Sequence, residues 1–140
     1  MDKFREIRPI VLGVIVKNGK LLVSEGIDSK KGTTFYRCLG GGIEFLETST
    51  EALKREFMEE IGIDIDVTDF LGITENIFTY EGKAGHEIVF FYSINIKDAD
   101  YKEAYTLTEE GKESKAIWVD IDDFKTNKKI LYPEAIFKYI

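Results

Sequence analysis

The stretch GGIEFLETSTEALKREFMEEIGI, residues 41–63, is the most informative part of this 140-residue chain. Thr48, followed three residues later by Glu51, matches a capping box, in which each side chain satisfies a backbone N–H at the start of a helix. Gly62 suits the left-handed backbone that often ends a helix. We therefore predict a helix from Ser49 to Ile61 that follows a glycine-rich loop.

This predicted helix has an apolar face and an acidic face. At about 100° per residue, one stripe consists of apolar residues: Leu53, Phe57 and Ile61. A neighbouring stripe carries three carboxylates: Glu56, Glu59 and Glu60. Unpaired like charges at positions i and i+4 cost a few tenths of a kcal/mol, and clustered carboxylates suit Mg²⁺ or Mn²⁺. The alternative is a solvated helix whose acids are balanced by Lys54 and Arg55.

The spacing in this stretch resembles the Nudix box, GX5EX7REUXEEXGU, in which U is a bulky apolar residue. Its fixed positions are all matched: Gly41, Glu47, Arg55, Glu56, Phe57, Glu59, Glu60, Gly62 and Ile63. The flanking stretches YRCLGGGIEF and AIWVDIDDF also look like this family. The resemblance implies an α/β fold, the Nudix α/β/α sandwich, with a mixed β-sheet and a loop-helix-loop catalytic motif. One departure is Leu46, at a position where many relatives have glycine.

The resemblance also implies a reaction, namely metal-dependent hydrolysis of the pyrophosphate linkage in a nucleoside diphosphate linked to another moiety. Its implied ligands for Mg²⁺ or Mn²⁺ are three carboxylates and one backbone carbonyl: Glu56, Glu59, Glu60 and Gly41. Arg55 is expected to pair with Glu47 across the junction of loop and helix, which would hold the carboxylates in position. The substrate stays open among nucleoside triphosphates, nucleotide sugars, ADP-ribose and dinucleoside polyphosphates.

The resemblance leaves the general base open between a box glutamate and an acid from a distant loop. Some relatives place such an acid in the charged segment before Trp118, where the candidates are Glu103, Glu110 and Glu113. We select Glu113, which would have to come within hydrogen-bond reach of the attacking water, and a solvated side chain is the alternative for each of these acids. Arg37, next to the glycine loop, and Arg8, on the first predicted strand, are the candidates for binding substrate phosphates. A surface salt bridge is the alternative role for each arginine.

The order of predicted elements favours a mixed sheet between helices over a regular βαβ alternation. We expect six stretches to contain strands: residues 7–17, 20–25, 35–39, 63–79 with a break near 69–72, 87–96 and 116–119. The segments 26–34, 80–86 and 97–115 are predicted loops or turns, and 121–125 and 133–140 short helices. His86 is expected to be structural or exposed. The strand aromatics could stack on a base or fill the core: Phe78, Tyr80, Phe90, Phe91 and Tyr92.

Length and charge limit the remaining possibilities. The 140 residues suit a single domain, residues 1–140, and a net charge of −7 argues against broad nucleic-acid binding. No apolar run reaches the roughly 20 residues of a membrane span, and residues 1–10 are too charged for a signal peptide. The lone Cys38 fits a reducing cytoplasm, which is the expected location. A homodimer is left open.

Two other classes of protein compete with the enzyme. One is a nucleotide-binding or regulatory module that keeps the fold without hydrolysis. A pure sensor has no need of a carboxylate cluster that costs stability without a cation, which argues against it. The other is an acidic metal-binding protein with no nucleotide partner, but that reading gives no reason for the glycine loop.

Overall fold

The computed structural model describes residues 5–109 and 112–140, and its described side chains exclude those of 108–113. Two β-sheets form the centre of the fold. Sheet A has the order β5-β1-β7-β6, from β5 (Gly40–Gly42), β1 (Ile7–Val14), β7 (Lys83–Asn95) and β6 (Asp66–Tyr80). Sheet B has the order β10-β4-β3-β9-β8, from β10 (Ile130–Tyr132), β4 (Thr33–Cys38), β3 (Lys20–Asp28), β9 (Lys112–Asp120) and β8 (Ala104–Glu109), and β2 (Val16–Lys17) pairs with β3.

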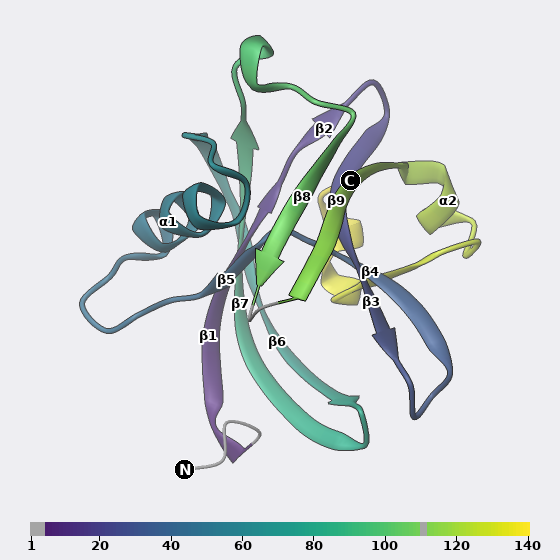
Figure 1. Ribbon diagram of the computed structural model, residues 1–140. Coiled ribbons are helices and arrows are strands. Elements are labelled where there is room, and N and C mark those ends of the chain that lie inside the picture. The colour runs from purple at the N-terminus through teal and green to yellow at the C-terminus, as the bar shows by residue number, and fades with distance from the viewer. Residues whose placement is uncertain (1–4, 110–111) are drawn as a thin grey trace.

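Both sheets mix parallel and antiparallel pairs, as the sequence predicted. Strand β1 runs parallel to β7, and β10 runs parallel to β4, while the other pairs are antiparallel. Helix α1 (Ser49–Ile61) lies on one side of the strands, and α2 (Ile121–Lys125) lies on the other (Figure 1). Two short 3₁₀ helices complete the fold: η2 (Asp98–Asp100) and η3 (Glu134–Lys138). The predicted α/β/α sandwich is confirmed.

The second half of strand β1, from Ile10 onwards, is buried on both faces and separates two hydrophobic cores. Ile10, Leu12 and Val14 pack in one core with residues of α2 and η3. Val11, together with Ile15 directly after the strand, packs in the second core with residues of α1. A strand covered on both faces has a continuous apolar sequence, which explains the unbroken run around IVLGVIV.

Helix α1 has the predicted bounds and caps. The Oγ1 of Thr48 accepts a hydrogen bond from the backbone N–H of Glu51 at 3.2 Å, and the Thr48 backbone N–H donates to the Glu51 carboxylate at 2.9 Å. Gly62 ends the helix in the left-handed conformation, with φ of 69°. Leu53 and Phe57 are fully buried. The acidic face of the helix is therefore fixed relative to the core.

The predicted loop at 97–115 is wrong, because this segment contains β8 and the start of β9. The alternation of Tyr105 and Leu107 with threonines places these two apolar side chains in the core, at 4% and 1% exposure. Because charged residues flank this short apolar alternation, the sequence pattern did not indicate a strand here.

Other strands are longer than predicted. Strands β3 and β4 extend into the predicted 26–34 loop, and the turn between β6 and β7 consists only of Glu81 and Gly82. His86 therefore lies within β7, which corrects its predicted position in a turn. The predicted break near 69–72 corresponds to two β-bulges in the otherwise continuous β6. No helix within residues 5–109 and 112–140 is long and apolar enough to cross a membrane.

Candidate active site

Three consecutive glycines of β5 bring the backbone close to the acidic face of α1. A Cβ atom on Gly40 would lie 2.0 Å from the carbonyl oxygen of Val11, and its φ of +152° also favours glycine. A Cβ atom on Gly41 would lie 2.5 Å from the Cδ of Glu56. At Gly42 the nearest atom would be a guanidinium nitrogen of Arg8 at 3.6 Å, so this position has room. Glycine at 41 therefore allows the Glu56 carboxylate to approach the loop.

Arg55 connects the loop to the helix carboxylates. Its Nε and Nη2 donate to the two oxygens of Glu47 at 2.7 and 2.9 Å, in the bidentate geometry of strong Arg–carboxylate pairs. Nη2 also donates to the carbonyl of Gly42 at 2.9 Å. Nη1 donates to Glu56 at 2.8 Å and to Glu59 at 3.3 Å. Within the described part of the chain, these five bonds use all the N–H groups of a guanidinium. The predicted Arg55–Glu47 pair is present.

The ion pair shifts the titration of both partners. Hydrogen bonds from Arg55, followed by the backbone N–H of Glu44, lower the pKa of Glu47 from 4.5 to about 2. The hydrogen bonds to Glu47 raise the pKa of Arg55 further above its usual range. Glu47 therefore stays ionised over the whole physiological range of pH and keeps the loop attached to Arg55.

The other two box glutamates have different surroundings. Glu59 has a side chain that is 60% exposed, whereas Glu60 is only 8% exposed and lines a cavity of about 280 Å³ together with Gly40, Gly41 and Gly42. We call this space the catalytic cavity.

No group of three or more acidic, histidine or cysteine side chains among the described residues is close enough to hold a metal ion. Arg55 bonds to two of the box carboxylates, Glu56 and Glu59. The donor chemistry nevertheless fits a hard cation, because the residues here offer carboxylate and carbonyl oxygens. The Glu56 carboxylate lies directly against Gly41, so carboxylate and backbone carbonyl oxygens are close together here.

Arg8, Arg37 and Glu87 line both the catalytic cavity and a second cavity of about 690 Å³, which we call the outer cavity. The Nη2 of Arg37 donates to the Oε1 of Glu87 at 2.7 Å. The Nε of Arg37 is buried and has no hydrogen-bond partner within the described residues. The two arginines proposed from the sequence as phosphate ligands thus lie where the cavities meet.

Aromatic rings line the outer cavity beyond this junction. The Phe35 ring covers Gly26, its ladder partner, and the Phe78 ring covers its ladder partner Gly85. A Cβ atom on either glycine would lie 2.5 Å or less from the ring. The ring of Phe35 also contacts those of Tyr80 and Tyr132, at centroid distances of 6.0 and 5.6 Å. The glycines therefore let aromatic rings lie flat on the strands of both cavity walls.

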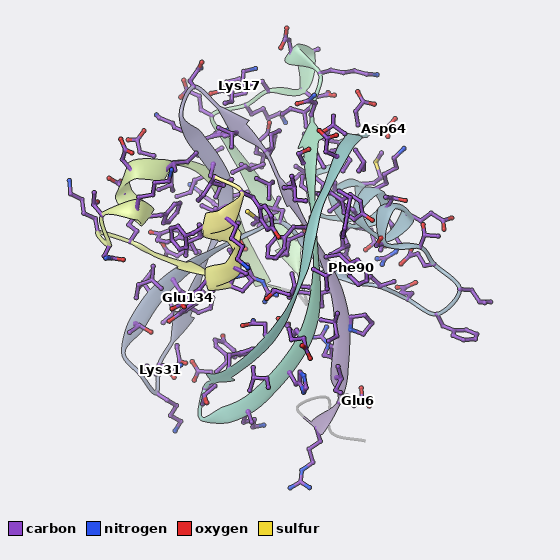
Figure 2. The ribbon with its side chains drawn as sticks, turned by 180° about the vertical axis from the view of Figure 1, so that it is seen from behind. Glu6, Lys17, Lys31, Asp64, Phe90 and Glu134 are labelled. Atoms are coloured by element: carbon purple, nitrogen blue, oxygen red, sulfur yellow. The ribbon has the colours of Figure 1, made fainter. Side chains whose placement is uncertain are left out.

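Two hairpin tips are joined beside the outer cavity. The Nζ of Lys31, in the β3–β4 turn, donates to the carbonyl of Thr79 on β6 at 2.7 Å. The buried Asp28 accepts hydrogen bonds from the backbone N–H groups of Lys30, Lys31 and Glu81. Figure 2 shows Lys31 on one hairpin beside the β6–β7 hairpin, with Glu134 on the neighbouring η3 segment. These contacts fix the two cavity walls relative to each other.

For Glu113, the predicted general base, the structure describes only the backbone. Glu113 lies on β9 and pairs with Thr108, and its side chain is outside the described part of the structure, as is all of Glu110. Glu103 is exposed and lies between η2 and β8. The next ladder pair along from Glu113 joins Ser114 to Leu107, and Leu107 lines the catalytic cavity.

Sequence reasoning missed Glu87 and Asn76, which line the outer cavity. Glu87 shares the inward phase of Val89 and Phe91 on β7, and all three are nearly fully buried. The sequence signal that could have identified Glu87 is a carboxylate at an inward-facing position of an otherwise apolar strand. Asn76 pairs with Glu87 across the β6–β7 ladder, which sequence pattern alone does not fix.

The loop between β5 and α1 explains the departure at Leu46. This residue has φ of +68°, in the left-handed region that glycine adopts at low cost, and its side chain is 90% exposed. The Glu47 carboxylate that follows is held by Arg55 and by the backbone N–H of Glu44. The loop therefore keeps its conformation with leucine at a position that favours glycine.

The comparison with known families agrees with this geometry. The family model described as NUDIX domain matches residues 7–138. The chain therefore belongs to the Nudix family, and the protein is a hydrolase of the family that cleaves pyrophosphate linkages in nucleoside diphosphate derivatives.

Solved structures show the same fold at low sequence identity. A Nudix hydrolase from Nitrosomonas europaea is 22% identical, with 95% of this chain and 85% of that chain covered and a TM-score of 0.63. The MutT protein from Methanosarcina mazei Go1 is 16% identical, with coverages of 93% and 87% and a TM-score of 0.64. A Nudix-family hydrolase from Clostridium perfringens is 21% identical, with coverages of 89% and 88% and a TM-score of 0.55.

The Glu47–Arg55 pair predicts a specific dependence of stability on pH. Because the folded-state pKa of Glu47 lies below its ordinary value of 4.5, ionised Glu47 stabilises the fold fully above pH 4.5 and loses this effect as the pH falls towards about 2. The difference in free energy of unfolding between the wild type and Glu47→Gln, measured with urea, should shrink over that interval. Glu44→Gln, whose native carboxylate lies 3.8 Å from Arg55 and is 69% exposed, is the control and should show little difference. A Glu47→Gln difference that stays constant down to pH 2 would contradict the assignment.

Proposed function

We propose that this hydrolase uses Mg²⁺ or Mn²⁺ to cleave the pyrophosphate linkage of a nucleoside diphosphate joined to another moiety. One observation carries the proposal. The glycine loop and Glu60 line a catalytic cavity that meets the aromatic-lined outer cavity at Arg8 and Arg37. A diphosphate at the junction would extend its remaining part into the outer cavity.

The proposed cation ligands are the three helix carboxylates and the carbonyl of Gly41. A divalent cation bound there would polarise a phosphoryl oxygen and lower the pKa of a bound water. Arg55 already bonds to Glu56 and Glu59, so cation binding would exchange some of these bonds for metal–oxygen contacts. The bidentate bond to Glu47 would keep Arg55 in place during this exchange.

Arg37 and Arg8 are proposed to bind the substrate phosphates. The Arg37 side chain is 29% exposed and lines both cavities, which supports this role, because a guanidinium matches the geometry and charge of a phosphate. The aromatic rings farther along the strands would stack on a nucleobase.

Glu113 is the proposed general base, which would take the proton from the attacking water. This choice rests on the family resemblance, because some relatives place such an acid in the segment before Trp118. Glu59 is proposed to take part in catalysis from the exposed end of the carboxylate row. Arg55 and Glu47 act as positioning residues, because they hold the loop and carboxylates and need not contact the substrate.

Two expectations about the protein's surroundings remain predictions. Cytoplasmic location rests on the lone Cys38, whose burial raises its pKa to about 12 and keeps the thiol protonated. A homodimer remains open.

The non-catalytic nucleotide-binding module is the alternative function, and turnover measurements separate it from the enzyme.

Turnover of a substrate panel tests the proposed function. Nucleoside triphosphates, nucleotide sugars, ADP-ribose and dinucleoside polyphosphates should be assayed with Mg²⁺ or Mn²⁺ for phosphate and nucleotide release. We expect turnover of at least one class, abolished by chelation and reduced about a hundredfold or more in Glu60→Gln. Thermal unfolding would establish that this variant is folded. Nucleotide binding with no turnover of any substrate by the wild type would favour the non-catalytic module.

Neighbouring glycines provide a matched test of the loop geometry. Gly41→Ala should push the Glu56 carboxylate away, because the new Cβ would lie 2.5 Å from its Cδ. We expect the Mg²⁺ concentration required for half-maximal turnover to rise about 10–100-fold. Gly42→Ala, whose Cβ has 3.6 Å of clearance, should stay within about twofold of the wild type. Equal effects of the two substitutions would contradict the placement of Glu56 against Gly41.

A further inference from the structure

A row of polar side chains crosses sheet A where the two cavities meet. Arg8, Glu87 and Asn76 are ladder partners on β1, β7 and β6, so their side chains point to the same face of the sheet. The hydrogen bond from Arg37 on β4 to Glu87 shows that this face looks towards sheet B. Asn76 lines the outer cavity.

Glu87 is a buried carboxylate with one oxygen available to a ligand. Its side chain is only 5% exposed, and burying a charge costs several kcal/mol unless it is well paired. Arg37 bonds to Oε1 alone, and no hydrogen bond to Oε2 is present within the described residues. Glu87 lines both cavities, and Oε2 is the oxygen that Arg37 leaves available to a ligand there.

The junction therefore requires two kinds of ligand atom. The guanidinium of Arg37, whose side chain is 29% exposed and lines both cavities, requires an anionic acceptor, and a phosphate oxygen meets this requirement. The free oxygen of Glu87 requires a hydrogen-bond donor and would repel a phosphate. The Asn76 side chain makes no hydrogen bond in the described part of the chain, and its amide can both donate and accept. An acceptor directly followed by neighbouring hydroxyl donors is the arrangement of a phosphate joined to a ribose.

The positions along the strands favour a sugar over a base at this point. Phe35 lies two residues from Arg37 on β4, and Phe78 lies two residues from Asn76 on β6. Two residues of a strand span roughly 7 Å, at about 3.3 Å per residue. Both rings lie on the hairpin side of the polar row, away from the glycine loop that follows Arg37. A ribose at Glu87 and Asn76 would place the base beside these rings.

We propose that Glu87 and Asn76 bind the ribose 2′- and 3′-hydroxyls, so that the enzyme prefers ribonucleotides to deoxyribonucleotides. This inference rests on the proposed function. Glu87 accepts a hydroxyl hydrogen through Oε2, and Asn76 bonds to the neighbouring hydroxyl. Through Oε1, Glu87 also positions Arg37 for the phosphate.

The test compares kcat/KM for the best ribonucleotide substrate with that for its 2′-deoxy and 3′-deoxy counterparts. A site built to hydrogen-bond a hydroxyl rejects analogues that lack it, so the wild type should favour the ribonucleotide by about tenfold or more. Asn76→Ala and Glu87→Gln should each reduce this preference severalfold. Arg37→Ala should lower kcat/KM for all three sugars by a similar factor and leave the preference unchanged. Asn95→Ala, an exposed asparagine at the other end of β7, is the matched surface control.

Glu87→Gln changes both the bond to Arg37 and the proposed contact with the sugar, and the same substitution in an Arg37→Ala background separates these two effects. Loss of ribose preference in that background supports direct contact with the sugar. Equal kcat/KM for the three sugars in the wild type, or an unchanged preference in folded Asn76→Ala and Glu87→Gln, would overturn the proposal.

A binding measurement keeps the sugar proposal separate from the proposed function. Calorimetric titration with the four common ribonucleoside diphosphates and their 2′-deoxy counterparts requires no turnover. Tighter binding of the ribose form, reduced in Asn76→Ala, would support the sugar site even if the wild type hydrolysed nothing. Turnover with equal affinity for both sugars would retain the hydrolase and reject the sugar site.

Discussion

The five hydrogen bonds donated by Arg55 are the interaction on which the catalytic cavity depends. Three of them go to Glu47 and the Gly42 carbonyl in the loop, and two go to Glu56 and Glu59 on the helix. One guanidinium therefore sets the spacing between the two halves of the motif and offsets the repulsion between clustered carboxylates. A lysine could not reproduce this, because an ammonium has three donors and no planar fork.

Arg55 can hold the loop and the helix carboxylates at a fixed spacing only because the hydrophobic core fixes the helix that carries Arg55. The capping box and Gly62 determine where α1 begins and ends, and the buried Leu53 and Phe57 determine which face it presents. Strand β1 contributes side chains both to this core and to the core that contains α2 and η3, and it lies between the two. The outer cavity lies between walls from both sheets, which are joined by Arg37–Glu87 and by the hairpin-tip contacts. In the proposed function, specificity and catalysis thus depend on different elements that meet at the row of polar side chains Arg8, Glu87 and Asn76.

The sequence predicted best what local chemistry determines. Helix α1 has its predicted bounds because capping signals act within a few residues, and Arg55 meets Glu47 because the motif spacing requires it. The pair of Arg37 and Glu87 was not predicted, because its members are 50 residues apart and meet only through the packing of two sheets. Strand β8 was missed because Tyr105 and Leu107 are the only buried apolar signal between charged residues in the described part of that segment.

The most direct test of this account is the affinity for Mn²⁺ of Arg55→Lys, measured by calorimetry beside the wild type. Lysine keeps the positive charge, so a change in affinity would reflect the lost geometry of the carboxylates. The account predicts Mn²⁺ binding about 10–100-fold weaker, in a protein that still unfolds cooperatively. Wild-type affinity in Arg55→Lys would contradict the claim that the Arg55 hydrogen bonds organise the site.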